Sequence, residues 1–276
     1  WSELIPSGTE HGFVGGTVDG DDVRIGFSHT ERQVRIDDHP VRQLDRLLQQ
    51  RPAVPFTPAD LALVQGGPKG RRRLLDQIAF TLFVEHADLA RRYAQALQAR
   101  NALLRSRRPD VELLAVWTHE LARYGCKLID QREQAAEALG PHLIDAYAHL
   151  SGEQESLAAQ YRPTVAAGEG REERLLEAID RATARDKKVH YTTVGPHTED
   201  WQLELDQRLL RSGASQGQQR SAVLALRLAQ VALAGAGGGP SPTLLLDDIA
   251  GELDDRRSAA LFERLLDGNG QVFVDR

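Results

Sequence analysis

Residues 244–254 read Leu-Leu-Leu-Asp-Asp-Ile-Ala-Gly-Glu-Leu-Asp, and this stretch decides the fold. Three apolar residues that run directly into two acids are typical of a buried parallel strand with carboxylates at its carboxyl end. In an open α/β sheet, ligands bind at the carboxyl ends of the strands. The stretch therefore predicts a strand at residues 243–246, with Asp247 and Asp248 at the edge of a ligand site.

A second stretch lies about thirty residues upstream, where residues 214–220 read Ala-Ser-Gln-Gly-Gln-Gln-Arg. It opens an apolar-striped segment, which predicts a helix over residues 217–233. The first N–H groups of a helix have no intrahelical partner and attract anions, and a glycine there allows close approach. Ser215, Gly217 and Gln218 are therefore candidates to contact a phosphate.

Together, the two stretches resemble those of ATP-binding-cassette (ABC) ATPase heads, and their detailed sequence resembles the RecF family of DNA replication and repair proteins. That family carries Gly-Pro-His-Arg-Asp-Asp-Leu, then Ser-x-Gly-Gln, then apolar-Asp-Asp followed by Ser-Glu-Leu-Asp. This chain has Gly-Pro-His-Thr-Glu-Asp-Trp at residues 195–201, and residues 67–76 are similar to a further arginine-rich family stretch. Thr198 and Gly251 depart from the family's arginine and serine. The resemblance runs through nearly the whole chain in the same order.

The resemblance implies an α/β fold. We expect an ABC-type ATPase head, made of an antiparallel β region and a parallel α/β sheet, with an inserted antiparallel helical hairpin. Residues 1–80 would form the first part of the head and residues 81–165 the hairpin. Residues 166–276 would complete the head and carry both phosphate-site motifs.

Local patterns predict the individual elements. Alternating residues between 12 and 36 predict short antiparallel strands, and Thr57 with Pro58 predicts a helix start. Further helices are expected at residues 41–50, 142–161, 171–185 and 255–266, and further strands at 54–56, 189–194, 202–205 and 271–274.

Two apolar seams in the middle of the chain predict the hairpin. They consist of Phe83, Ala87, Ala90, Ala94, Leu97, Asn101 and Leu104, and of Leu114, Trp117, Leu121, Tyr124, Leu128, Gln131, Ala135 and Ala138. Each arm would be about 35–45 Å long at 1.5 Å per residue, and Gly140-Pro141 would end the second arm. Two ordinary helices of a bundle would show similar seams, so that alternative stays open.

The resemblance also implies roles for the motif residues, with ATP and Mg²⁺ as cofactors. Asp247 would hold Mg²⁺, and Asp248 would be the catalytic base that orients the attacking water. The alternative for Asp247 and Asp248 is a pair of acids that cap the following turn, whereas a simple N-cap role for Ser215 is compatible with the phosphate role. His197 marks the family stretch, and a structural turn histidine is the favoured interpretation. Asp254 would lie at the seam of a dimer.

Within such a dimer, Ser215, Gly217 and Gln218 would contact the γ-phosphate of ATP bound by a second subunit. The implied function is an ATP-dependent homodimer that clamps double-stranded or gapped DNA, with Arg71 and Arg72 facing phosphates. RecR- and RecO-type repair proteins would be its partners in loading recombinase.

No Gly-x-x-x-x-Gly-Lys-Ser/Thr loop, which cradles phosphates in such ATPases, occurs in the sequence. We expect the chain to be a fragment of a weak ATPase, inactive alone; a degenerate head that binds no nucleotide is the alternative. Another repair ATPase of the RecN or overcoming-lysogenization type, or a non-enzymatic scaffold, are the competing functions.

The 276 residues are 41% hydrophobic and 27% charged with a net charge of −6, which indicates a globular protein without an overall positive field. No run of eighteen apolar residues occurs, so no membrane span is predicted. The single cysteine, Cys126, fits a reducing compartment, and we expect a cytoplasmic protein. A cluster formed by Arg100, Arg105, Arg107 and Arg108 is a second candidate basic patch.

Overall fold

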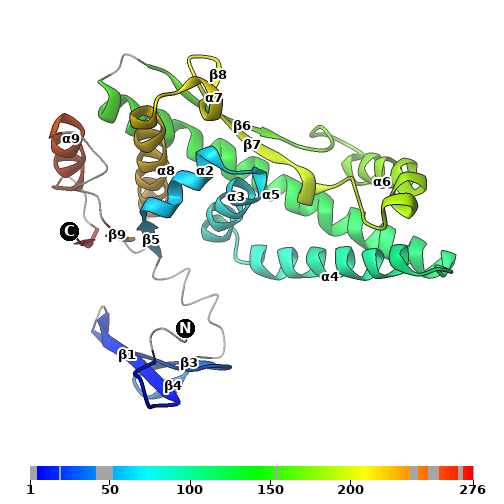
Figure 1. The fold of residues 1–276 in the computed structure, drawn as a ribbon, viewed down its shortest axis with the longest axis horizontal. Coiled ribbons are helices and arrows are strands. Elements are labelled where there is room, and N and C mark those ends of the chain that lie inside the picture. Colours follow the sequence, from blue (N-terminus) through cyan, green and yellow to red (C-terminus); the bar gives the residue numbers. More distant parts are fainter. Residues whose placement is uncertain are drawn as a thin grey trace. The chain divides into compact units, whose positions relative to one another are not determined.

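The computed structural model describes residues 5–18, 20–41, 52–152, 155–236, 242–247, 255–266 and 270–275. They belong to two compact units, residues 1–50 and 51–276, which we treat separately (Figure 1). The helix expected at residues 41–50 lies outside the described residues, apart from Val41.

The first unit is a four-stranded antiparallel sheet with the strand order β1-β2-β3-β4. Its strands are β1 (His11–Val18), β2 (Asp21–Ser28), β3 (Arg32–Ile36) and β4 (His39–Pro40). A two-residue turn joins the last two strands, and both of its residues, Asp37 and Asp38, have positive φ angles of 47° and 63°. Such turns match the twist of antiparallel strands. The predicted antiparallel region is confirmed.

The second unit contains the predicted parallel sheet, with the strand order β10-β9-β5. The strands are β5 (Ala53–Phe56), β9 (Thr243–Leu246) and β10 (Val272–Val274). Strand β9 is central and parallel to both neighbours. Its Leu244 and Leu246 side chains are 1% and 2% exposed, whereas Leu245 is 38% exposed, so one face of the predicted buried strand packs into the core.

A second, antiparallel sheet has the order β6-β7-β8, and helices account for most of the remaining unit. The strands are β6 (Leu157–Arg162), β7 (Asp200–Leu205) and β8 (Arg208–Leu209). The helices are α2 (Ala62–Gln65), α3 (Pro68–Leu82), α4 (His86–Arg105), α5 (Val111–Ser151), α6 (Arg171–Val189), α7 (Leu210–Gly213), α8 (Gln216–Ala236) and α9 (Asp255–Leu266), with 3-10 turns η2 (Pro58–Leu61) and η3 (Pro196–Thr198).

The predicted hairpin exists: α4 and α5 run side by side, and α6 packs against α5 (Figure 1). The expected end at Gly140-Pro141 is wrong, because α5 continues through both residues to Ser151. Its 41 residues make it about 60 Å long. Leu139 and Leu143, on either side of the proline, are fully buried, so tertiary packing holds the helix where a backbone hydrogen bond is lost.

Two strand and helix expectations are also wrong. Residues 157–162 form strand β6, paired with β7, instead of the end of a helix. Residues 189–194 form no strand, because α6 continues to Val189 and ends at His190 with a φ angle of 65°. The predictions at residues 54–56, 171–185, 202–205, 217–233, 255–266 and 271–274 are confirmed within a few residues.

The seam expected on α4 is displaced by one residue over most of its length, and Leu104 is buried as predicted. The buried face consists of His86, Leu89, Tyr93, Ala96, Arg100 and Leu104. Ala94, which the expected seam contained, is exposed. The displacement arises because His86 and Arg100 are polar yet buried with partners, so an apolar pattern cannot locate them. On α5 the expected positions Leu114, Leu121 and Leu128 are buried, as predicted.

Arg100, expected in an exposed basic patch, is 0% exposed. Its Nη1 donates to Asp186 Oδ2 at 2.8 Å and to Thr192 Oγ1 at 2.7 Å, and Nε donates to Thr118 Oγ1 at 3.0 Å. Asp186 is equally buried and also accepts from Thr193. The pair joins α4 to α6 and to the segment that follows α6.

We predict that Asp186→Ala lowers the free energy of unfolding by about 3–5 kcal/mol, because it leaves the Arg100 charge buried without its partner. Urea unfolding followed by circular dichroism measures the change. Asp180→Ala, at an exposed position of the same helix, should change the value by no more than about 0.5 kcal/mol. Equal losses for both variants would contradict the assignment.

Candidate functional site

Asp247 lies where the sequence placed it, directly after the central parallel strand β9. Its N–H donates to the Phe56 carbonyl of β5 at 3.0 Å, and the N–H of Asp275, after β10, donates to the Leu246 carbonyl at 2.8 Å. The Asp247 side chain is exposed. A carboxylate at the carboxyl edge of the sheet is therefore open to a ligand. Asp248 and Asp254 lie outside the described residues.

Ser215 begins α8 through a reciprocal capping box. The Ser215 N–H donates to Gln218 Oε1 at 2.7 Å, and the Gln218 N–H donates to Ser215 Oγ at 3.3 Å. This arrangement satisfies one amide inside the first turn. The amides of Gln216 and Gly217 have no acceptor within the helix, as at any helix start. Ser215 is exposed, and Gly217 and Gln218 are half-buried.

The helix that follows the strand-tip acids reaches the start of α8. Arg257 of α9 lies so close to Gly217 that a Cβ built on this glycine would be 2.9 Å from Arg257 Nη1. Because Gly217 has no side chain, it leaves room for the Arg257 side chain of α9. Through this contact, the first turn of α9 and the first turn of α8 are neighbours.

Asp247 and Ser215 themselves are separated within one chain. Leu244 at the start of β9 lines a cavity of about 130 Å³ with Leu228 and Val231 of α8. Ser215 precedes Leu228 by 13 residues, a rise of about 20 Å along a helix. Among the residues that the structure describes, no hydrogen bond or ion pair joins Asp247 to Ser215, Gly217 or Gln218.

The geometry does not support a DNA contact by Arg71. Its side chain is 9% exposed. The guanidinium makes a two-pronged ion pair with Asp200 at 2.8 and 3.0 Å and donates to the carbonyls of Leu63 and Gly66. The positive charge of Arg71 is therefore already paired with a carboxylate inside the protein. Arg71 therefore stabilises the packing of α3 against β7.

Arg72 is half-buried, and its Nη1 donates to the Glu199 carbonyl at 2.6 Å. Burial, with the nearby Arg132 charge, lowers its pKa from the ordinary value. It borders a cavity of about 310 Å³ between α3 and α4, together with the exposed Lys69 and Arg73. The basic stretch thus presents Lys69, Arg72 and Arg73 on one side of α3 and keeps Arg71 inside.

The Gly-Pro-His turn is structural. His197 Nε2 lies 3.0 Å from the Thr192 carbonyl, which can only accept, so Nε2 carries the proton. Nδ1 then accepts from the Tyr93 hydroxyl at 2.6 Å. Burial, as the main cause, lowers the pKa of His197. Gly195 has a φ of 133°, and a Cβ there would lie 2.8 Å from the Tyr93 hydroxyl oxygen.

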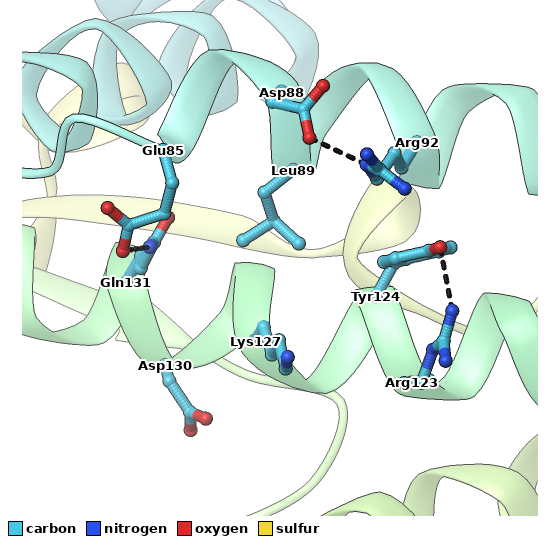
Figure 2. A pocket seen from close by; sticks show the side chains of 9 residues that line it. All are labelled: Glu85, Asp88, Leu89, Arg92, Arg123, Tyr124, Lys127, Asp130 and Gln131. Carbon is cyan, nitrogen blue, oxygen red and sulfur yellow. Dashed lines mark hydrogen bonds and ion pairs between the residues drawn. The ribbon is translucent and has the colours of Figure 1, made fainter.

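A larger cavity of about 650 Å³ lies between α4 and α5 (Figure 2). Its polar side chains bind one another: Asp88 accepts from Arg92 at 2.6 Å, and Glu85 accepts from Gln131 at 3.0 Å. Arg123 also donates to the Tyr124 hydroxyl at 2.7 Å. Asp88, Glu85 and Arg123 thus already have partners, although Lys127 also lines the cavity. None of the expected site residues lines it.

Comparison with known proteins decides the family. The chain is 38% identical over 285 residues to the DNA replication and repair protein RecF of Anaeromyxobacter sp. (strain Fw109-5), covering 99% of this chain and 76% of that protein. It is 35% identical over 273 residues to RecF of Thermosynechococcus vestitus, covering 95% and 72%. The chain belongs to the RecF family.

Solved RecF structures have the same fold. One described as RecF-ATP of the RecFOR pathway matches with a TM-score of 0.86 at 26% identity, over 100% of this chain and 77% of that one. A second, described as RecF-ATPrS, gives 0.86 at 24% identity. The chain matches no protein-family model. The predicted ABC-type α/β head with an inserted helical hairpin is confirmed.

We predict that His197 contributes less stability in acid. Its lowered folded-state pKa means that the unfolded chain binds more protons just below the ordinary value of about 6.5. The contribution is therefore complete above pH 6.5 and is lost as the pH falls toward the folded-state pKa. Urea unfolding between pH 7.5 and 5 should show the wild-type advantage over His197→Gln shrinking. His119→Gln, the same change at an exposed site of α5, is the control, and an equal pH trend in both variants would contradict the prediction.

Proposed function

We propose that this chain is the ATP-binding head of a RecF-type repair ATPase, which dimerises on ATP and binds DNA as a dimer. Family membership supports it, as does the similarity to a structure described as RecF-ATP. One observation carries the proposal. Asp247, a carboxylate that could bind a metal ion, and Ser215, at a helix start that could bind a phosphate, are both exposed but lie at separate places of one chain.

Their separation favours a composite site. A carboxylate at a sheet edge and the amides at a helix start both suit nucleotide phosphates, the first through a metal ion and the second directly. Because about 13 residues of helix lie between Ser215 and the part of α8 beside β9, one triphosphate would be reached most simply from two copies. A two-fold dimer would then form two equal sites.

Mg²⁺ fits the sheet edge. Asp247 offers an exposed hard oxygen ligand, and Mg²⁺ usually takes one or two carboxylates together with phosphate oxygens and water. When bound, the ion would neutralise charge on the β- and γ-phosphates. In this proposal Asp248 orients the attacking water and Asp254 lies at the dimer seam.

The proposal includes DNA binding because one side of α3 is positively charged. Lys69, Arg72 and Arg73 form the basic side of α3, and phosphate contacts by such residues are salt-dependent and indifferent to sequence. Arg71 is left out because its charge is used internally. RecO- and RecR-type proteins are proposed as partners, since the similar structures are assigned to the RecFOR pathway.

We predict that Ser215→Arg weakens ATP-dependent dimerisation of the full-length protein at least about tenfold. A long cation replaces the N-cap at the centre of the proposed contact, where single substitutions commonly cost more than 1 kcal/mol. Sedimentation velocity with a non-hydrolysed ATP analogue measures the dimer fraction.

Ser106→Arg, the same change at the exposed end of α4, is the matched control and should dimerise like the wild type. If Ser215→Arg also dimerises like the wild type, the composite site is wrong. A wild type that stays monomeric with ATP favours the scaffold alternative.

We also predict that Asp247→Asn weakens Mg²⁺-dependent ATP binding at least about tenfold, because it removes the charged oxygen ligand. Titration calorimetry with and without Mg²⁺ separates the ion's contribution. Asp180→Asn, on an exposed face of α6, should leave both titrations unchanged, and an unchanged Mg²⁺ dependence in Asp247→Asn would remove this residue from the site.

A further inference from the structure

One acidic side chain outside the family stretches touches the start of α8. Glu155 lies in the segment between α5 and β6, and its Oε1 accepts from Gln218 Nε2 at 2.5 Å. Its other oxygen, Oε2, accepts from the Tyr147 hydroxyl at 2.7 Å. A carboxylate is the side chain that accepts from two donors at once without offering a proton of its own.

Each end of this bridge is fixed by the surrounding protein. Tyr147 belongs to the last turns of α5 and is 1% exposed. Burial, with the bond to Glu155, raises its pKa above the ordinary value, so the phenol keeps its proton and donates. The backbone beside Glu155 is held as well: Ser156 N–H donates to Asp206 Oδ1, and Asp206 N–H donates to the Ser156 carbonyl, both at 3.0 Å.

The bridge determines the orientation of the Gln218 amide. With Nε2 directed at Glu155, Gln218 Oε1 is left to accept from the Ser215 N–H at 2.7 Å. A rotated amide would place its NH₂ group against the Ser215 N–H and lose both bonds. The capping box at the exposed helix start therefore depends on a carboxylate that the long helix α5 holds in place.

We propose that Glu155 is a positioning residue that couples the long hairpin helix α5, through Tyr147, to the conformation of the Ser215 helix start. This inference rests on the proposed function, because it assigns regulation to the same site. A shift of the end of α5 changes the position of the Glu155 carboxylate, and with it the orientation in which Ser215 would meet the nucleotide of a second subunit. Mutations along such hydrogen-bond chains typically change the coupling by about 0.5–2 kcal/mol, which is roughly two- to thirtyfold in an equilibrium constant.

The test uses Tyr147→Phe and Glu155→Gln in the full-length protein. Tyr147→Phe removes only the hydroxyl and keeps the packed ring, so the fold is retained. Glu155→Gln keeps the shape but replaces one acceptor by a donor. The matched controls are Tyr191→Phe and Glu173→Gln, both at exposed positions.

Without nucleotide, hydrogen exchange of the amides at residues 215–219 should be faster in both variants than in their controls. With an ATP analogue, the dimerisation constant should fall roughly three- to tenfold, and thermal unfolding should show that the variants remain folded. Unchanged exchange, or unchanged dimerisation, overturns the coupling.

The two proposals fail in different ways. If the wild type dimerises with ATP, Ser215→Arg does not, and Tyr147→Phe behaves like Tyr191→Phe, the coupling is wrong and the proposed function stands. If the wild type remains monomeric with ATP, both are overturned.

Discussion

The Arg132 guanidinium is the interaction on which the second unit depends. From the middle of α5 it binds both oxygens of Asp76 on α3, at 2.7 and 2.9 Å, and donates to the Pro196 carbonyl at 2.7 Å. Burial alone would raise the pKa of Asp76, but the nearby His86 ring and the hydrogen bonds from Arg132 outweigh it and lower the pKa. A buried charge is stable only when fully paired, and here the pairing requires three separate segments to meet.

This requirement explains why two family stretches that are far apart in the sequence go together. Arg71 and Asp76 belong to the arginine-rich stretch on α3, while Pro196 and Asp200 belong to the Gly-Pro-His stretch. Each side supplies the partners for the other. Within the described residues, these charged groups of the two stretches pair with partners inside the protein, and the pairs hold the helical part against the sheets.

Sequence patterns correctly predicted the elements that are specified by residues close together in the sequence. Leu244 and Leu246 are apolar because they face the core on one side of β9, and Ser215 followed by Gln218 is a helix-start pattern that can be recognised in the local sequence. The predictions were wrong where a partner far away in the sequence determines whether a side chain is buried. Arg71 and Arg100 look like surface cations until Asp200 and Asp186 are brought to them. Glu155 could not be found, because it meets Gln218 across 63 residues.

Helix α5 contributes to both apolar cores of the second unit. Its Leu121, Leu128 and Ile129 face the hairpin core, and its Leu139, Leu143 and Tyr147 face the core beside the parallel sheet. A segment excised at the hairpin's ends would either cut this helix or expose half of its apolar face to water. The hairpin is therefore not a separable module, and the two cores should unfold cooperatively in a single transition.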